Sequence, residues 1–444
     1  MWSRRRAAAP LLAAAALLAA SVAPIARADV RADSTVPPAP APAVLAPLDP
    51  SAAPVPTASG VAAKIGRLAR EVRGAAVLVV DPVSGEPLFA RQADVPLVPA
   101  STTKLTTAVA ALTVLGPETR IPTVAYTDGR TLYLVGGGDP TLVRAKGGDP
   151  LGGGSASLGA LAGAVAAEVT GPIDLVYDTS AFKGPTLGPG WPASFPAAGV
   201  AAPVTALVVD GGRTRPGANS RVVDPAKQAA TVFSDLLAKE GVRVTAVSKG
   251  RLVDGATEVA RVESPPIADI VERTLTESEN NYAEALAHLV GGASLGKPSF
   301  SGGAAATLQA LQELGVDTAN VTLADGSGLS RRDRIPAGVL AGILTEVVQG
   351  DDADLAPIAP GLPVAGLTGT LADRFATAAT RPGRGFVHAK TGTLTGVVSL
   401  AGTVLDADGG LLVFAMISND VPSLAQARET MDEIASQLAT CGCS

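Results

Sequence analysis

Histidine is scarce in this chain: the 444 residues include only His288 and His388. A Ser-His-Asp triad would need one of the two, and no G-x-S-x-G string marks a serine for it. The metal-binding strings H-E-x-x-H and H-x-x-E-H are also absent, so the sequence gives no support to a zinc peptidase, and we expect no metal or other cofactor. We interpret His388 as a packed or solvated strand residue, because a lone histidine is a weak functional signal.

Cysteine, net positive charge and aromatic side chains are equally sparse. Cys441 and Cys443 stand together at the end of the chain, where they could pair with each other, bond another molecule or lie in a disordered tail. We assign them no catalytic role. The net charge of −6 and the pI near 5.2 argue against nucleic acid and anionic membranes as partners. Aromatic residues make up only 3% of the sequence, so the core must consist mainly of valine, leucine, isoleucine and alanine.

The amino-terminal region has the composition of an export signal followed by a spacer. A basic start precedes an alanine- and leucine-rich stretch, and the small-residue string A-R-A at 26–28 resembles a cleavage site, which predicts a signal peptide over 1–28. Retention of this segment as an anchor is the alternative. Residues 29–60 are rich in proline and alanine and predict an extended linker. No later segment is long and apolar enough to cross a bilayer, so we expect an exported protein of the cell envelope, or a secreted one.

A nucleophile motif follows this linker. Ser101 and Lys104 belong to the string S-T-T-K, and the apolar run after it, from Leu105 to Leu115, ends at glycine and proline, which predicts a helix. Ser101 would lie at the N-terminus of this helix, with Lys104 on the same face and within reach of its hydroxyl. A serine attacks only after a base takes its proton, and lysine can be that base when burial and nearby positive charge keep it neutral. Alone, S-x-x-K is also typical of a helix cap beside a solvated lysine.

A second string, K-T-G, begins at Lys390. Three strands are predicted around it, at 385–389, 397–404 and 411–418. Lys390 can bind a substrate carboxylate, and Thr391 can add a hydroxyl hydrogen bond. Gly392 lets the substrate backbone approach closely, since a side chain there would obstruct it. The backbone N–H of Thr393, paired with that of Ser101, can form an oxyanion hole.

The third string, S-E-N, runs from Ser278 to Asn280 and joins two helical patterns. These patterns cover 267–276 and 282–290. Ser278 can pass a proton between Lys104 and a leaving amine, and Asn280 can hydrogen-bond a substrate amide. By itself the string would be interpreted as a polar turn between helices.

Taken together and in their order along the chain, which is S-T-T-K, S-E-N and then K-T-G, the three strings resemble the active-site motifs of the class C low-molecular-mass penicillin-binding proteins, the D-alanyl-D-alanine carboxypeptidase/endopeptidase family. The resemblance spans roughly 75–420 and includes segments such as 134–142, 202–207 and 325–331. It implies an α/β (α+β) fold, a serine β-lactamase/transpeptidase-like domain in which an antiparallel sheet is flanked by helices. One departure is Glu279, where the family often has aspartate; we expect this residue to face away from the cleft.

The spacing of the first two strings along the chain predicts a large inserted module. Ser278 lies 177 residues after Ser101, and a structureless loop of that length is implausible. The segments between them are apolar and divided by glycine and proline turns. Three parts after the linker are therefore expected: the catalytic domain in two segments, 61–125 and 268–437, the inserted domain or domains over 126–267, and a tail over 438–444.

The resemblance implies a serine D-Ala-D-Ala carboxypeptidase that trims peptidoglycan stem peptides through a Ser101 acyl-enzyme and that β-lactams inhibit. Lys104 would be the base and Ser278 the proton relay. The expected substrate-binding residues are Asn280, Lys390, Thr391, Gly392 and Thr393. The sequence does not separate this activity from endopeptidase action on cross-bridges. Two alternatives are a β-lactamase or esterase on the same fold and a non-catalytic peptidoglycan-binding protein, although an idle site would have no need of the intact serine and lysines.

Overall fold

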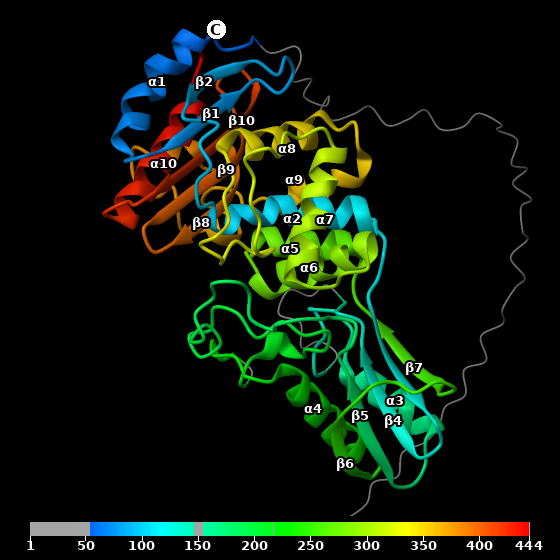
Figure 1. Ribbon diagram of the computed structural model, residues 1–444. Helices are drawn as coiled ribbons and strands as arrows, with labels where there is room; N and C mark the ends of the chain where they lie inside the picture. The colour runs from blue at the N-terminus through cyan, green and yellow to red at the C-terminus, as the bar shows by residue number, and fades with distance from the viewer. Residues whose placement is uncertain (1–53, 146–153, 216, 444) are drawn as a thin grey trace, which may run out of the picture. The chain divides into compact units, whose positions relative to one another are not determined.

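The computed structural model describes residues 54–145, 154–215 and 217–443. The predicted signal peptide and most of the predicted linker lie outside the described residues. Two five-stranded sheets organise the described chain (Figure 1). The first has the strand order β2-β1-β10-β9-β8, and the second has the order β6-β5-β4-β3-β7.

The first sheet is antiparallel throughout. Its strands are β1 (Ala76–Val80), β2 (Pro87–Arg91), β8 (Val387–Leu394), β9 (Val397–Leu405) and β10 (Leu411–Asn419). Side chains of β10 alternate between two separate apolar clusters: Val413 and Ile417 belong to one, and Phe414 and Met416 to the other. Because successive side chains of a strand point to opposite faces, both faces of this sheet must be covered.

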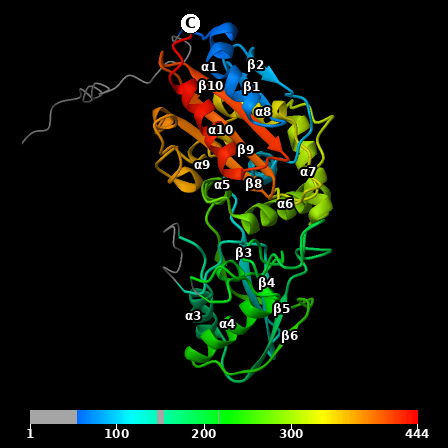
Figure 2. The same cartoon turned by 90° about the vertical axis from the view of Figure 1, so that its left-hand side faces the viewer.

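Helices cover both faces, and α10 crosses in front of β8, β9 and β10 in Figure 2. One face carries α1 (Ala58–Glu71) and α10 (Leu424–Ala439). The other carries α2 (Lys104–Leu115), α5 (Ile267–Thr276), α6 (Asn280–Leu295), α7 (Phe300–Glu313), α8 (Ala337–Gln349) and α9 (Ile358–Gly361). Short 3-10 turns are η2 (Ala100–Thr103), η3 (Asp210–Gly212), η4 (Ala353–Leu355), η5 (Gly369–Leu371) and η6 (Arg381–Gly383). The prediction of an antiparallel sheet flanked by helices is confirmed.

The second sheet is formed by residues that lie, in the sequence, between the S-T-T-K and S-E-N strings. Its strands are β3 (Pro122–Thr127), β4 (Thr131–Gly136), β5 (Ile173–Asp178), β6 (Val244–Lys249) and β7 (Thr257–Glu263). The pairs β4–β5 and β5–β6 are parallel, whereas β3 is antiparallel to both of its neighbours. Two helices, α3 (Leu158–Glu168) and α4 (Pro225–Lys239), bury a separate apolar core against it that includes Leu132, Leu175 and Phe233. This region therefore has a core of its own.

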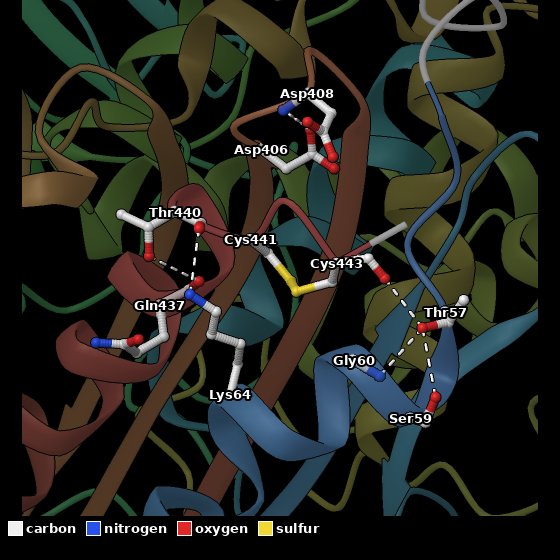
Figure 3. The surroundings of a disulfide bond; sticks show 10 residues. All are labelled: Thr57, Ser59, Gly60, Lys64, Asp406, Asp408, Gln437, Thr440, Cys441 and Cys443. Atoms are coloured by element: carbon white, nitrogen blue, oxygen red, sulfur yellow. Dashed lines mark hydrogen bonds between the residues drawn. A yellow bond between two sulfur atoms is a disulfide. The ribbon is translucent and has the colours of Figure 1, made fainter.

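The two cysteines at the end of the chain form a disulfide with each other (Figure 3). The carbonyl oxygen of Cys443 accepts hydrogen bonds from the backbone N–H and the hydroxyl of Thr57, each 2.9 Å long. Thr57 is the N-cap of α1, so the last residues of the predicted linker are helical. The end of the chain is thus packed against the start of α1. Within the described residues, no helix combines the length and the apolar character needed to span a bilayer.

Candidate active site

Ser101 lies in the 3-10 turn η2, directly before α2. The residue before it, Ala100, has φ +52°, a left-handed conformation that is costly for a residue with a side chain. The backbone of Gly328 packs directly against this turn. A Cβ at position 328 would lie only 1.9 Å from the carbonyl oxygen of Ala100. Close packing of two backbones therefore fixes the strained turn that carries the serine.

Lys104 is the first residue of α2, and its side chain is fully buried. Its ammonium nitrogen donates to Ser101 Oγ at 3.0 Å, to Asn280 Oδ1 at 2.8 Å and to the carbonyl oxygen of Ser327 at 2.7 Å. Burial lowers the pKa of Lys104 to about 8, against the carboxyls of Glu284 and Asp325, which raise it. About a tenth of such a lysine is neutral at pH 7, compared with far less for a solvated one.

The S-E-N string forms the turn between α5 and α6. Ser278 has φ +58°, a second strained position at the site. Asn280 is the first residue of α6; its oxygen accepts from Lys104, and its amide nitrogen donates to the carbonyl oxygen of Val200 at 2.8 Å. The oxygen and the nitrogen of the Asn280 amide are thus both hydrogen-bonded to other groups of the protein. Glu279 forms an ion pair with Arg213 at 4.0 Å.

Lys390 lies in β8 and is also fully buried. Its ammonium nitrogen donates to the carbonyl oxygen of Thr391 at 3.1 Å. Burial, and to a smaller degree the charge of Lys104, lower the pKa of Lys390 well below that of an ordinary lysine. We expected Lys390 to bind a substrate carboxylate by direct contact, whereas its side chain lies beneath the surface of the site.

The free edge of β8 presents backbone donors next to the serine. The Ala389 N–H points away from β9 and donates to the carbonyl oxygen of Pro363 at 2.9 Å. Because successive N–H groups of a strand alternate between its edges, those of Thr391 and Thr393 point the same way. Beyond Ala389, the described residues provide no strand partner for this edge. The Thr391 hydroxyl forms a 2.7 Å hydrogen bond with that of Thr370.

Gly392 brings β8 against the nucleophile turn. A Cβ at this position would lie 2.1 Å from Ser399 Oγ, 2.8 Å from the carbonyl oxygen of Pro99 and 3.0 Å from the backbone nitrogen of Ser101. We expected this glycine to make room for a substrate backbone. Its bare face instead makes room for the backbone that carries Ser101.

A cavity of about 600 Å³ opens in front of these residues. Of the predicted site residues, Ser101, Ser278, Thr391 and Thr393 line it. The other four, Lys104, Asn280, Lys390 and Gly392, do not belong to its lining. The structure therefore brings residues from the three strings, far apart in the sequence, to one place and divides them into a lining layer and a supporting layer.

Sequence reasoning missed three groups that hold the base in place. Two are backbone carbonyls, those of Val200 and Ser327, and a carbonyl leaves no signal in a sequence. The third is Glu284, a fully buried acid on α6 that accepts hydrogen bonds from the backbone N–H groups of Gly326 and Ser327. Burial, and then the nearby Asp325, raise the pKa of Glu284 to about 8. Its position four residues after Asn280, on the same face of a helix, was the one available signal.

The fold and the site define a serine peptidase of the penicillin-binding type. Comparison with known families agrees: the model of the D-Ala-D-Ala carboxypeptidase 3 (S13) family matches residues 59–221 and 214–440. The chain belongs to this family, which confirms the resemblance seen in its sequence.

Similar proteins extend over most of the chain. Carboxypeptidase Rv3627c of Mycobacterium tuberculosis is 37% identical over 94% of this chain and 92% of its own length. The D-alanyl-D-alanine carboxypeptidase of Actinomadura sp. is 30% identical and covers 77% of both chains. Among solved structures, penicillin-binding protein 4 of Haemophilus influenzae is similar, with a TM-score of 0.71, 22% identity and coverage of 84% of this chain and 97% of that one. The last comparison supports the fold.

Proposed function

We propose that this protein is an exported serine D-Ala-D-Ala carboxypeptidase that trims peptidoglycan stem peptides through an acyl-enzyme on Ser101. The observation that carries the proposal is the contact between Ser101 Oγ and Lys104, a fully buried lysine 3.0 Å away whose pKa burial lowers to about 8. A lysine that is partly neutral and hydrogen-bonded to a serine is the arrangement that a general base requires.

Acylation follows from this geometry. Neutral Lys104 takes the proton of Ser101 as its oxygen attacks the carbonyl carbon of the penultimate D-alanine. The N–H groups of Ser101 and Thr393 donate hydrogen bonds to the carbonyl oxygen and so stabilise the negative charge that develops on it. When the C–N bond breaks, the proton on Lys104 passes through the hydroxyl of Ser278 to the leaving amine, and D-alanine departs. Water then hydrolyses the ester and restores the serine.

The free edge of β8 positions the substrate in this proposal. A peptide can add to that edge as a further strand, because the N–H groups of Thr391 and Thr393 point outward from it. The Thr391 hydroxyl binds the terminal carboxylate of the substrate, and Lys390, buried behind Thr391, takes up a proton as that carboxylate binds. Asn280, held by Lys104 and Val200, fixes the base more than it contacts the substrate.

β-Lactams resemble the D-Ala-D-Ala end of the substrate, and we propose that they acylate Ser101. The test compares wild-type protein with Ser101→Ala after incubation with a fluorescent penicillin. A persistent label on the wild type alone, together with D-alanine release from a pentapeptide, supports the proposal. Rapid penicillin turnover without a lasting adduct would favour a β-lactamase instead, and an unlabelled wild type would favour a non-catalytic binding protein.

A further inference from the structure

One segment of the inserted region, residues 188–202, packs against the helices that carry the active site. We call it the anchoring segment. Trp191 and Ala201 of this segment are buried in an apolar cluster with Phe300 of α7 and with Leu329. The core between the second sheet and its helices includes no residue of the anchoring segment. Although this segment lies within the inserted region of the sequence, it is therefore packed as part of the catalytic domain.

The two asparagines that begin α6 hold one end of the anchoring segment. Asn280 donates from its amide nitrogen to the carbonyl oxygen of Val200 at 2.8 Å. Asn281 forms two hydrogen bonds with Ala202: its oxygen accepts from the backbone N–H at 2.9 Å, and its nitrogen donates to the carbonyl oxygen at 3.0 Å. Because both backbone groups of Ala202 are bound to one side chain, the position of this backbone is fixed. The carbonyl of Val200, two residues earlier, is fixed with it.

The other end of the anchoring segment is bound to the loop that contains Ser327. The indole N–H of Trp191 donates to the carboxylate of Asp325 at 2.7 Å, and both side chains are buried. The Ser330 hydroxyl donates to the carbonyl oxygen of Pro189 at 2.7 Å. These two contacts lie on either side of Ser327, whose carbonyl oxygen accepts from the proposed base. The anchoring segment thus holds both elements that supply fixed acceptors to this lysine.

These acceptors decide where the lone pair of the neutral base points. An ammonium group has three N–H donors and no lone pair, whereas a neutral amine has two N–H donors and one lone pair. The carbonyl oxygen of Ser327 and the amide oxygen of Asn280 can only accept, so they take the two N–H groups of neutral Lys104. The lone pair is then left facing the third contact, Ser101 Oγ, whose proton it must take.

A reversed Asn280 amide would disable this arrangement. Its nitrogen would face Lys104 and donate to the lone pair, and its oxygen would face the carbonyl oxygen of Val200 with no proton between them. Because the carbonyl of Val200 is only an acceptor, it stabilises the productive orientation of the amide and opposes the reversed one. The orientation of the Asn280 amide therefore depends on where the anchoring segment places Val200.

We propose that the anchoring segment sets the orientation of the Asn280 amide, and that Asn281 and Trp191 are positioning residues for the reaction at Ser101. The inference rests on the proposed function, because it concerns the same base and nucleophile. Neither Asn281 nor Trp191 belongs to the lining of the cavity, so both act through other residues and not on the substrate. The inserted region then contributes to the chemical step itself.

The test measures penicillin acylation of Asn281→Ala, which removes both hydrogen bonds to Ala202. The limiting acylation rate at saturating penicillin should fall about three- to tenfold, the factor that corresponds to the loss of one net hydrogen bond. The penicillin concentration that gives half of this rate should stay within about twofold, because no contact with the ligand is lost. Final labelling should still reach one penicillin per chain, which shows that the variant is folded.

Two further variants support this measurement. Trp191→Phe keeps an aromatic ring in the apolar cluster but removes the N–H that binds Asp325, so it should slow acylation by a similar factor. Asn320→Ala replaces an exposed asparagine between α7 and α8 and is the matched control. It should leave both the limiting rate and the half-saturating concentration unchanged.

A mutant cycle with Asn280→Ala separates positioning from general loosening of the structure. In the Asn280→Ala background there is no amide to orient, so the addition of Asn281→Ala should change the acylation rate by less than about twofold. If Asn281→Ala slows acylation by the same factor in both backgrounds, or slows it in neither, the anchoring segment does not act through Asn280, and the inference is wrong while the proposed function still stands. A wild type that takes no penicillin label contradicts the proposed function itself, and the inference with it.

Discussion

The carboxylate of Glu284 accepts a 2.8 Å hydrogen bond from the backbone N–H of Ser327, and the carbonyl oxygen of the same residue accepts a 2.7 Å hydrogen bond from Lys104. The backbone of one residue, Ser327, thus links a buried acid to the proposed base. Glu284 also raises the pKa of Lys104, partly opposing the effect of burial.

Replacement of Glu284 by glutamine should therefore move the pH profile of acylation. Glutamine keeps an oxygen that can accept from Ser327, but it removes the negative charge that stabilises protonated Lys104. Because the pKa of Glu284 is itself raised to about 8, this charge is only partly present over the range in which Lys104 titrates. The pKa of Lys104 therefore falls only slightly, and the acidic limb of the penicillin acylation rate should shift downward by well under about one pH unit. Asp325, which also raises the pKa of Lys104, remains in the variant and limits the shift.

A structural role alone would give a different result. If Glu284 only holds the loop, Glu284→Gln would lower the acylation rate at every pH and leave the midpoint of the limb unchanged. Glu279→Gln is a useful control, because this residue also raises the pKa of Lys104 but is a smaller cause and is partly exposed. Glu279→Gln should therefore move the acidic limb of the acylation rate in the same direction as Glu284→Gln, but by a smaller amount.

Gly392→Ala tests the contact between β8 and the nucleophile turn. The added Cβ would overlap Ser399 Oγ and crowd the carbonyl oxygen of Pro99, so β8 and the turn must separate. We expect penicillin acylation to fall at least about a hundredfold and the free energy of unfolding to fall by about 1–3 kcal/mol. Stopped-flow acylation and urea unfolding measure the two effects.

The control for this change is another glycine. Gly342 lies inside α8, and a Cβ there meets no atom within 4 Å. Gly342→Ala should raise the free energy of unfolding by about 0.5–1 kcal/mol and leave acylation unchanged. The double variant Gly392→Ala with Ser399→Ala, which removes the nearest atom, should recover part of the lost acylation. Full activity of Gly392→Ala alone would contradict the packing argument.

Local features of the site could be predicted from the sequence, and long-range ones could not. The helix expected at 267–276 coincides with α5, and the approach of Lys104 to Ser101 follows from their spacing on one helical turn. The meeting of the three strings depends on contacts across the whole chain, and only the family resemblance implied it. The distinction between residues that line the cavity and residues that support it could not be predicted, because it depends on burial.

Two ends of elements, one of a helix and one of a strand, differ between the sequence prediction and the structure, and each difference has a physical cause. The helix that follows the S-E-N turn was expected to end at 290, before a pair of glycines, whereas α6 continues to Leu295. Gly291 stays helical there because α7 packs directly on it: a Cβ would lie 2.5 Å from the backbone nitrogen of Gly303. The K-T-G string was expected just after a strand that ended at 389, but β8 runs through it to Leu394 because β9 pairs with its whole length.

The buried charge of Lys390 predicts proton uptake when a carboxylate binds. Burial lowers the pKa of Lys390 well below the ordinary value, because the charged form is disfavoured away from water. A substrate carboxylate favours the charged form, so binding raises the pKa of Lys390 and takes up a proton. Affinity for a substrate with a free carboxylate should therefore decrease as the pH rises, by up to about tenfold per pH unit.

Calorimetric titration of the Ser101→Ala variant in two buffers with different ionisation enthalpies measures this uptake. The comparison ligand is the same peptide with an amidated C-terminus, which should bind more weakly and without proton uptake. The variant that also carries Lys390→Met should bind the free-carboxylate peptide with no uptake either. Equal proton uptake for both peptides would mean that another group takes up the proton. Lys390 would then have no role in binding the carboxylate.

Asp139, in the segment that follows β4, predicts a pH-dependent stability that can be measured without any substrate. One of its carboxylate oxygens accepts from the backbone N–H and hydroxyl of Thr141 at 2.7 and 2.6 Å, whereas the other is buried without a partner among the described residues. Burial raises the pKa of Asp139 from 3.8 to about 6. Between these values the folded protein binds more protons at this site than the unfolded chain does, so the free energy of unfolding must fall as the pH rises from about 4 to about 6.

The expected contribution is about 2–3 kcal/mol, and urea unfolding at a series of pH values measures it. Asp139→Asn does not titrate, so its deficit relative to wild type should shrink by this amount over the same interval. A deficit that stays constant with pH would mean that folding leaves the pKa of Asp139 unchanged, and would contradict this prediction.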